Sequence, residues 1–202
     1  MRLVVALLGL SPLWAQGVSL GLRAGIPITP VLTANGGERA SGPRFTIGPL
    51  IEAHLLHGAG FAADFLLQCT DLAISSAGSQ YAQVWRWETP LTLIYRFRRP
   101  LRSFVRAGVS LNRVFDIRGA TECAHGPFGE LFYCLAGSSL AELRHRSTLG
   151  FVVGGGLRFS LNKLRLDPEI RVTHWIDRNF GVRDSAVRSN LNQIELLMGV
   201  VF

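Results

Sequence analysis

The stretch that decides the fold is Gln-Ile-Glu-Leu-Leu-Met-Gly-Val-Val-Phe at residues 193–202, the end of the sequence. Apolar residues stand at every second position, and Gln193 and Glu195 stand between them. Because successive side chains of a β-strand point to opposite faces, this strand has one apolar and one polar face. The chain stops on the aromatic Phe202, which suggests that the final strand closes a sheet.

The same alternation recurs in seven further segments, so the sequence predicts eight strands. Pro49 lies on the apolar parity of one segment, lacks a backbone donor and therefore predicts a bulge or local irregularity. The eight predicted strands cover residues 18–29, 45–56, 61–74, 81–97, 102–117, 147–161, 164–177 and 193–202.

The connections between these strands alternate in length, as expected for a barrel with one closed and one exposed rim. The tight turns are residues 57–60, 98–101 and 162–163. The long polar loops are residues 30–44, 118–146 and 178–192, and residues 75–80 form a shorter connection on the same rim.

Aromatic residues and charges decide which face of the barrel meets lipid. Trp85 and Trp87 lie toward one end of an apolar strand face, and Tyr95 and Phe97 lie toward the other, as two interfacial aromatic girdles. A soluble ligand-binding barrel needs neither these girdles nor mid-strand charges of both signs on the polar face. The expected fold class is therefore all-β, an eight-stranded antiparallel up-and-down transmembrane β-barrel.

The predicted inner face carries seven arginines and six carboxylates, and arginine suits bidentate pairing with carboxylates. This near-balance favours an ion-pair network that plugs the lumen over a selective pore. The predicted network consists of Arg23, Glu52, Asp64, Arg86, Glu88, Arg96, Arg106, Arg158, Arg165, Asp167, Glu169, Arg171 and Glu195.

The N-terminal residues have the pattern of an export signal. Arg2 precedes an apolar run that is shorter than the roughly 20 residues of a spanning helix, so a membrane anchor is the weaker alternative. We expect a signal peptide at residues 1–15, a barrel domain at residues 16–202 and a location in the outer membrane of the cell. Cys123 and Cys134 are a candidate disulfide in that oxidising compartment, the alternative being two free thiols in a loop.

The chain resembles the small outer-membrane barrel family of the OmpX/OmpA type over essentially its whole mature length. The resemblance is carried by residues 87–97, 151–159 and 164–175 and by the final Phe202. It implies insertion by the outer-membrane assembly machinery, which in this family reads the C-terminal strand, so that Phe202 is the expected assembly signal. It describes a fold and implies no reaction.

The formal net charge is +7, and the excess positive charge falls in loops and turns. We expect these arginines to meet outer-membrane lipid, in particular lipopolysaccharide phosphates, although ordinary solvated loops are the alternative. Nucleic acid is not expected as a partner, because the basic residues form no stripe with interleaved aromatics. The arginines concerned are Arg39, Arg44, Arg113, Arg118, Arg144, Arg146, Arg178, Arg183 and Arg188.

Two histidines invite an enzymatic interpretation. His145 stands two residues before Ser147, and His174 stands near Asp177, but neither pair has a third group at a spacing that orients the imidazole. No metal, phosphate-loop or cofactor motif is present, so we expect no cofactor. The sequence thus predicts a monomeric, non-enzymatic barrel with a structural or surface-interaction role; a minor pore for small solutes and a lipid-A-modifying enzyme are the alternatives.

Overall fold

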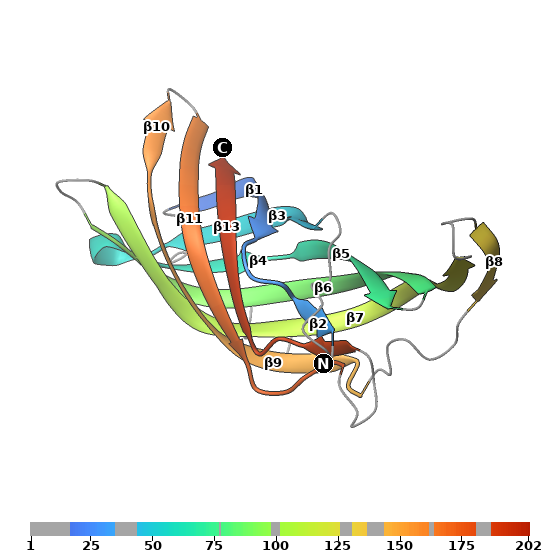
Figure 1. The fold of residues 1–202 in the computed structure, drawn as a ribbon. Coiled ribbons are helices and arrows are strands. Elements are labelled where there is room, and N and C mark those ends of the chain that lie inside the picture. Colours follow the sequence, from blue (N-terminus) through green and yellow to red (C-terminus); the bar gives the residue numbers. More distant parts are fainter. Residues whose placement is uncertain are drawn as a thin grey trace, which may run out of the picture.

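The computed structural model describes residues 17–34, 44–76, 78–97, 102–125, 131–136, 144–161, 164–180 and 187–202 (Figure 1). Within these residues no helix is long and apolar enough to cross a membrane. The elements are β1 (Val18–Pro27), β2 (Leu32–Ala34), β3 (Arg44–His54), the 3-10 turn η1 (Leu56–Gly58), β4 (Ala59–Asp64), β5 (Leu66–Ser76), β6 (Gly78–Arg96), β7 (Ser103–His125), β8 (Leu131–Ala136), β9 (Ser147–Leu157), β10 (Phe159–Leu161), β11 (Leu164–Trp175), β12 (Val187–Ser189) and β13 (Asn192–Val201).

The strands close into a barrel with eight antiparallel walls, which confirms the predicted fold class. Going round the barrel, the walls are β1, β3, β4 with β5, β6, β7, β9 with β10, β11 and β13. The first and last walls close it, because β1 pairs with β13 from Gly21 opposite Val201 to Pro27 opposite Glu195. The final strand therefore occupies the closing position that its sequence predicts.

The wall formed by β4 and β5 is interrupted beside Pro49, where the sequence predicts an irregularity. The interruption itself lies on the strand opposite Pro49. β4 and β5 are separated by Phe65, whose N–H donates to the Pro49 carbonyl at 3.0 Å. Beside it, a Cβ on Gly48 would lie only 1.8 Å from the Phe65 carbonyl oxygen. The backbones thus approach too closely for a side chain, which explains glycine at this position.

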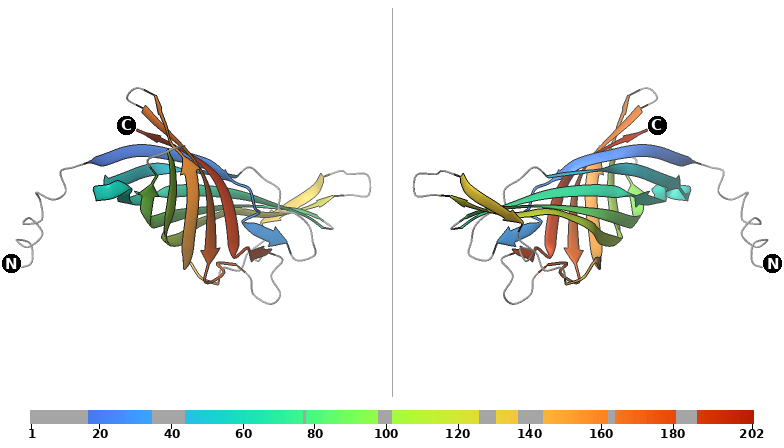
Figure 2. Two further views of the ribbon diagram at one scale, coloured as in Figure 1. Left: turned by 90° about the vertical axis from the view of Figure 1, so that its left-hand side faces the viewer. Right: turned by 90° about the vertical axis from the view of Figure 1, so that its right-hand side faces the viewer.

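The long loop predicted at residues 118–146 is partly wrong. β7 continues as far as His125, pairs with β6 as far as Ser79 and is followed by β8, which pairs back onto β7. Figures 1 and 2 show this extension reaching out beyond the barrel wall. Continued pairing with β6 satisfies the backbone groups that a polar loop would leave to water.

The core lies inside the barrel, and glycines on β9 make room for large side chains there. A Cβ on Gly156 would come within 2.7 Å of the Phe104 ring, and one on Gly150 within 2.7 Å of the Trp175 ring. Phe104 is an apolar residue on the polar inner face. It is buried, and the Arg158 guanidinium lies 5.6 Å from its ring centroid, a cation–π arrangement that accommodates it among charges.

Candidate functional site

The lumen is filled by charged side chains from all eight walls. At its centre Arg23, Arg106 and Arg171 meet the carboxylates of Asp64 and Glu169, and all five side chains are almost fully buried. Asp64 accepts from Arg23 at 2.6 Å, from Arg106 at 3.1 Å and from Arg171 at 2.5 Å. We call these five residues the central cluster; it ties together four walls of the barrel, those of β1, β4, β7 and β11.

A second group of ion pairs lies nearer the rim of short turns. Arg96, Arg158 and Arg165 all pair with Glu52, at 3.1, 3.3 and 2.6 Å. Arg158 and Arg165 also pair with Asp167, at 2.7 and 3.3 Å. We call these five residues the turn-side cluster. Each cluster has three arginines for two carboxylates, so each carries one excess positive charge.

The third group, nearer the long loops, is organised by amides. Gln68 donates one amide nitrogen to Glu88 at 2.5 Å and to Glu195 at 3.0 Å, while Gln193 donates to Glu195 at 2.8 Å. Arg86 donates to the Gln193 oxygen at 2.8 Å. The Thr46 and Ser110 hydroxyls also donate to Glu195 and Glu88, at 3.1 and 2.9 Å. In the described part of the chain these two glutamates and Arg86 form no direct ion pair, so amides and hydroxyls bind the glutamates of this loop-side cluster.

Asn179 and Phe180, in the loop that follows β11, form a cap on the loop side of the lumen. Asn179 follows β11, is buried, and its side chain accepts from Asn112 at 3.1 Å and donates to the His145 carbonyl at 2.8 Å. The neighbouring Phe180 is only 2% exposed. Sequence reasoning missed this cap, because alternation identifies inward residues on strands and says nothing of a loop that folds inward.

The outer surface has the opposite character. Every wall places apolar side chains outward, and many of them are about half exposed. Examples from different walls are Leu22, Phe61, Leu93, Phe151 and Ile170, between 50% and 58% exposed. A polar, ion-paired interior within a continuous apolar exterior is the arrangement of a barrel whose surroundings are lipid.

This is the fold of the small outer-membrane β-barrels. Neisserial surface protein A is similar to this barrel at 16% sequence identity, covering 91% of this chain and 94% of that one, with a TM-score of 0.50. The outer-membrane protein OprG from Pseudomonas aeruginosa is similar at 12% identity, covering 91% of this chain and 92% of that one, with a TM-score of 0.53. No model of a known protein family matches the sequence, and no curated protein matches it.

The predicted aromatic girdles lie on the outward face of β6 in this outer-membrane-type barrel. Trp87 stacks on Phe115 with ring centroids 6.0 Å apart, and Tyr95 meets Phe97 edge to face at 5.1 Å. Trp85 is half-buried, and its indole N–H donates to Gln83 at 2.9 Å. Tyr95 and Phe97 lie at the turn-side end of β6, whereas Trp85 and Trp87 lie mid-strand, because β6 extends beyond them to Gly78. A separation of eight residues between Trp87 and Tyr95 suits two interfacial girdles, where rings with one apolar and one polar environment are expected.

Cys69 lies on the outward parity of β5, yet it is not open to lipid. It stands opposite Phe45 on one side and Trp85 on the other, and these two rings lie 6.1 Å apart. Cys69 is consequently only 4% exposed. The flanking aromatic side chains thus cover this small residue on the outer face of the sheet.

The backbone register brings the two loop cysteines opposite each other. Cys123 on β7 and Cys134 on β8 are direct partners in the antiparallel pairing. Directly opposed residues have Cα atoms about 4.5–5.5 Å apart, a separation that a disulfide can span. The disulfide itself stays a prediction.

The histidines considered for catalysis lie on the outside of the barrel. His145 and Ser147 are both exposed. His174 is exposed too, and its Nδ1 lies 2.6 Å from the Asn192 side-chain oxygen, so that its partner among the described residues is an amide and not Asp177. The signal peptide predicted at residues 1–15 lies outside the described residues, as do the side chains of Arg39, Arg44, Arg118, Arg183 and Arg188.

Proposed function

We propose that the chain is an integral outer-membrane β-barrel, monomeric and without enzymatic activity, whose lumen is closed and whose role is structural or in surface interaction. The central cluster carries this proposal. A solute that crossed the lumen would have to separate buried ion pairs and leave uncompensated charges in a low-dielectric interior, which costs several kcal/mol per ion. The buried cap at Asn179 and Phe180 adds a second obstruction on the loop side.

Planar-bilayer recording tests the closed lumen against the alternative of a minor pore. We expect the refolded protein to give no stable channel steps, because the central cluster fills the lumen. A heat-dependent shift in mild detergent electrophoresis shows that the sample is a folded barrel. Stable steps from the shifted material would overturn the closed-lumen proposal, and a chain that is soluble without detergent and shows no shift would overturn the membrane barrel itself.

Lipopolysaccharide is the partner that we propose for the loop rim, and Arg113 supports it. Arg113 is exposed on the outward face of β7, between the apolar Leu111 and Phe115, with Trp87 opposite on β6. No ion pair holds its guanidinium among the described residues. An arginine on the lipid face costs ~2–4 kcal/mol at mid-membrane but only ~0–1 kcal/mol near the interface. Its position beside Trp87 therefore suits pairing with a lipid phosphate.

The substitution Arg113→Gln is expected to weaken binding to lipopolysaccharide vesicles by about fivefold, since one cation near an anionic surface contributes ~1 kcal/mol. Binding to vesicles of dephosphorylated lipopolysaccharide should differ little between this variant and the original protein. Arg113→Lys keeps the charge and serves as the matched control. If Arg113→Gln binds phosphorylated vesicles as tightly as Arg113→Lys, the phosphate contact is wrong.

A further inference from the structure

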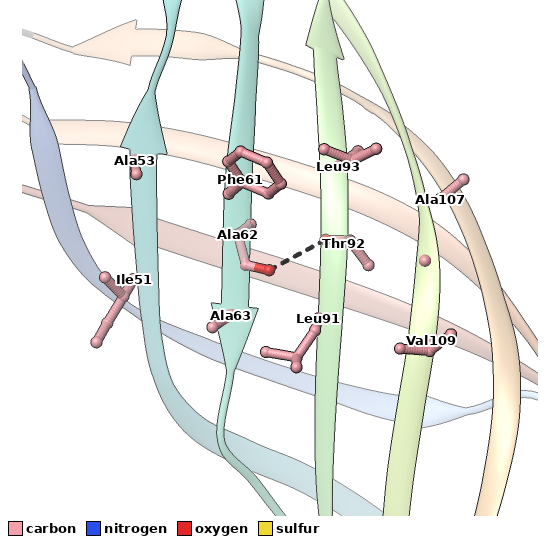
Figure 3. Close-up of a pocket in the computed structure, with 11 residues that line it drawn as sticks. Ile51, Ala53, Phe61, Ala62, Ala63, Leu91, Thr92, Leu93, Ala107 and Val109 are labelled. Carbon is pink, nitrogen blue, oxygen red and sulfur yellow. Dashed lines mark hydrogen bonds between the residues drawn. The ribbon is translucent and has the colours of Figure 1, made fainter. Parts of the chain in front are cut away.

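The lipid-facing surface is interrupted by a groove that crosses β3, β4, β6 and β7 (Figure 3). Its volume is about 490 Å³. Small residues line it where neighbouring positions carry large ones: Ala53, Ala63 and Ala107 lie among Phe61 and Leu93. Since these alanines point outward on strands of otherwise bulky apolar side chains, they leave a depression in the outer wall.

The groove offers nothing to a polar ligand. Thr92 supplies the hydroxyl among the lining side chains, and that hydroxyl donates to the Ala62 carbonyl at 3.4 Å (Figure 3). Along β6 the groove residues Leu91 and Leu93 lie between Trp87 and Tyr95, that is, between the two aromatic girdles. The groove is thus continuous with the apolar belt, at the depth of hydrocarbon chains.

A cation stands at the turn rim below the groove. The carbonyl of Ser103, the first residue of β7, accepts from the N–H of the girdle residue Phe97 at 2.9 Å. The preceding Arg102 is exposed, and its guanidinium donates to the Ser160 hydroxyl at 3.5 Å, a long contact that a phosphate can replace. Ala107 lies five positions after Arg102, a separation of about 17 Å along a strand. With a strand tilt of about 40° this corresponds to a depth of about 13 Å, half of an apolar band of ~25 Å.

We propose that the groove holds one acyl chain of a phospholipid whose phosphate pairs with Arg102. The dimensions fit a lipid of the leaflet on the turn side: the charged group lies at the girdle and the chain reaches to mid-membrane. Arg102 provides charge complementarity to the phosphate. This proposal rests on the outer-membrane barrel proposed above, and it adds a specific lipid site to it.

Native mass spectrometry of the barrel refolded with phosphatidylglycerol tests this site. We expect the protein to retain one phospholipid. Ala107→Phe fills the groove and should lower the retained fraction by at least about tenfold. Losing the burial of about two acyl-chain methylene groups is enough to weaken binding by that factor. Val153→Phe is the matched control, because Val153 stands opposite Ala107 on β9, faces outward and lies outside the groove lining. Arg102→Gln should lower retention about fivefold.

The site is refuted if the original protein retains no phospholipid, if it forms a lipid-free dimer, or if Ala107→Phe retains as much as Val153→Phe. Each variant is first checked for the heat-dependent electrophoretic shift. If Ala107→Phe fails to fold, the Arg102→Gln variant tests the site instead, because the Arg102 side chain is exposed and packs in no core. Unchanged phospholipid retention in Arg102→Gln contradicts the phosphate contact. Failure of the original protein to shift would instead count against the barrel, so the two proposals fail separately.

Discussion

Replacing Asp64 with asparagine is expected to lower the free energy of unfolding of the barrel by ~3–5 kcal/mol, the cost of leaving buried charge without its partner. Asp64 accepts from three arginines and is 0% exposed. Without its charge, Glu169 would remain as the one carboxylate of the central cluster, facing Arg23, Arg106 and Arg171. Repulsion among three buried guanidinium groups then adds to the lost pairing.

Urea unfolding in lipid vesicles, followed by the heat-modifiable electrophoretic band, measures this loss. Asp177→Asn is the matched control, because the same chemical change is made at an exposed residue. Adding Arg171→Gln to Asp64→Asn should be less harmful than the sum of the two single changes, because it removes one of the uncompensated cations. Equal stability of Asp64→Asn and Asp177→Asn would show that the central cluster does not hold the barrel together.

Deleting Phe202 is expected to remove most of the protein from the outer membrane of cells while leaving the stability of the refolded barrel nearly unchanged. The Phe202 ring is 67% exposed and packs little. Its backbone N–H donates to the Leu20 carbonyl at 2.9 Å, one bond at the end of the β1–β13 seam. So small a structural contribution cannot explain a large cellular loss, and recognition of the C-terminal residue by the assembly machinery would explain it.

Membrane levels in cells and urea stability of refolded protein are the two measurements needed. Phe202→Tyr keeps an aromatic C-terminus and should restore assembly. Phe159→Ala removes a comparably exposed ring, 51% exposed on β10, and should leave membrane levels nearly normal. Normal levels of the protein lacking Phe202 would contradict its role as an assembly signal.

Where a residue lies within a strand, its side of the wall could be predicted from the sequence. Arg23, Asp64 and Glu195 stand on the polar parity and are buried, while Leu22 and Leu196 stand on the apolar parity and are exposed. This works because the side-chain period of a strand is two, so a shift by one residue would invert every side chain of the wall. The same rule applied to uncharged residues identifies Gln68 and Gln193 as inward.

The partners of the inward charges could not be predicted in the same way. Arg165 and Glu52 are 113 positions apart in sequence and meet at 2.6 Å across the lumen. Arg86 is equally inward, yet its partner is the Gln193 amide and not a carboxylate. Relative shifts between neighbouring strands decide which side chains reach the same level, and alternation within one strand carries no information about those shifts.

By itself, the sequence determined the number of walls, the face that each strand residue occupies and the polarity of the two faces, because these follow from local alternation. Only the tertiary structure decided which charges pair, that Asn179 and Phe180 fold inward as a cap, that aromatic rings cover Cys69, and that three outward alanines make a groove. Each of those features depends on neighbours brought together across the closed sheet. Closure of the barrel, through pairing of its first and last strands, is the event that creates them.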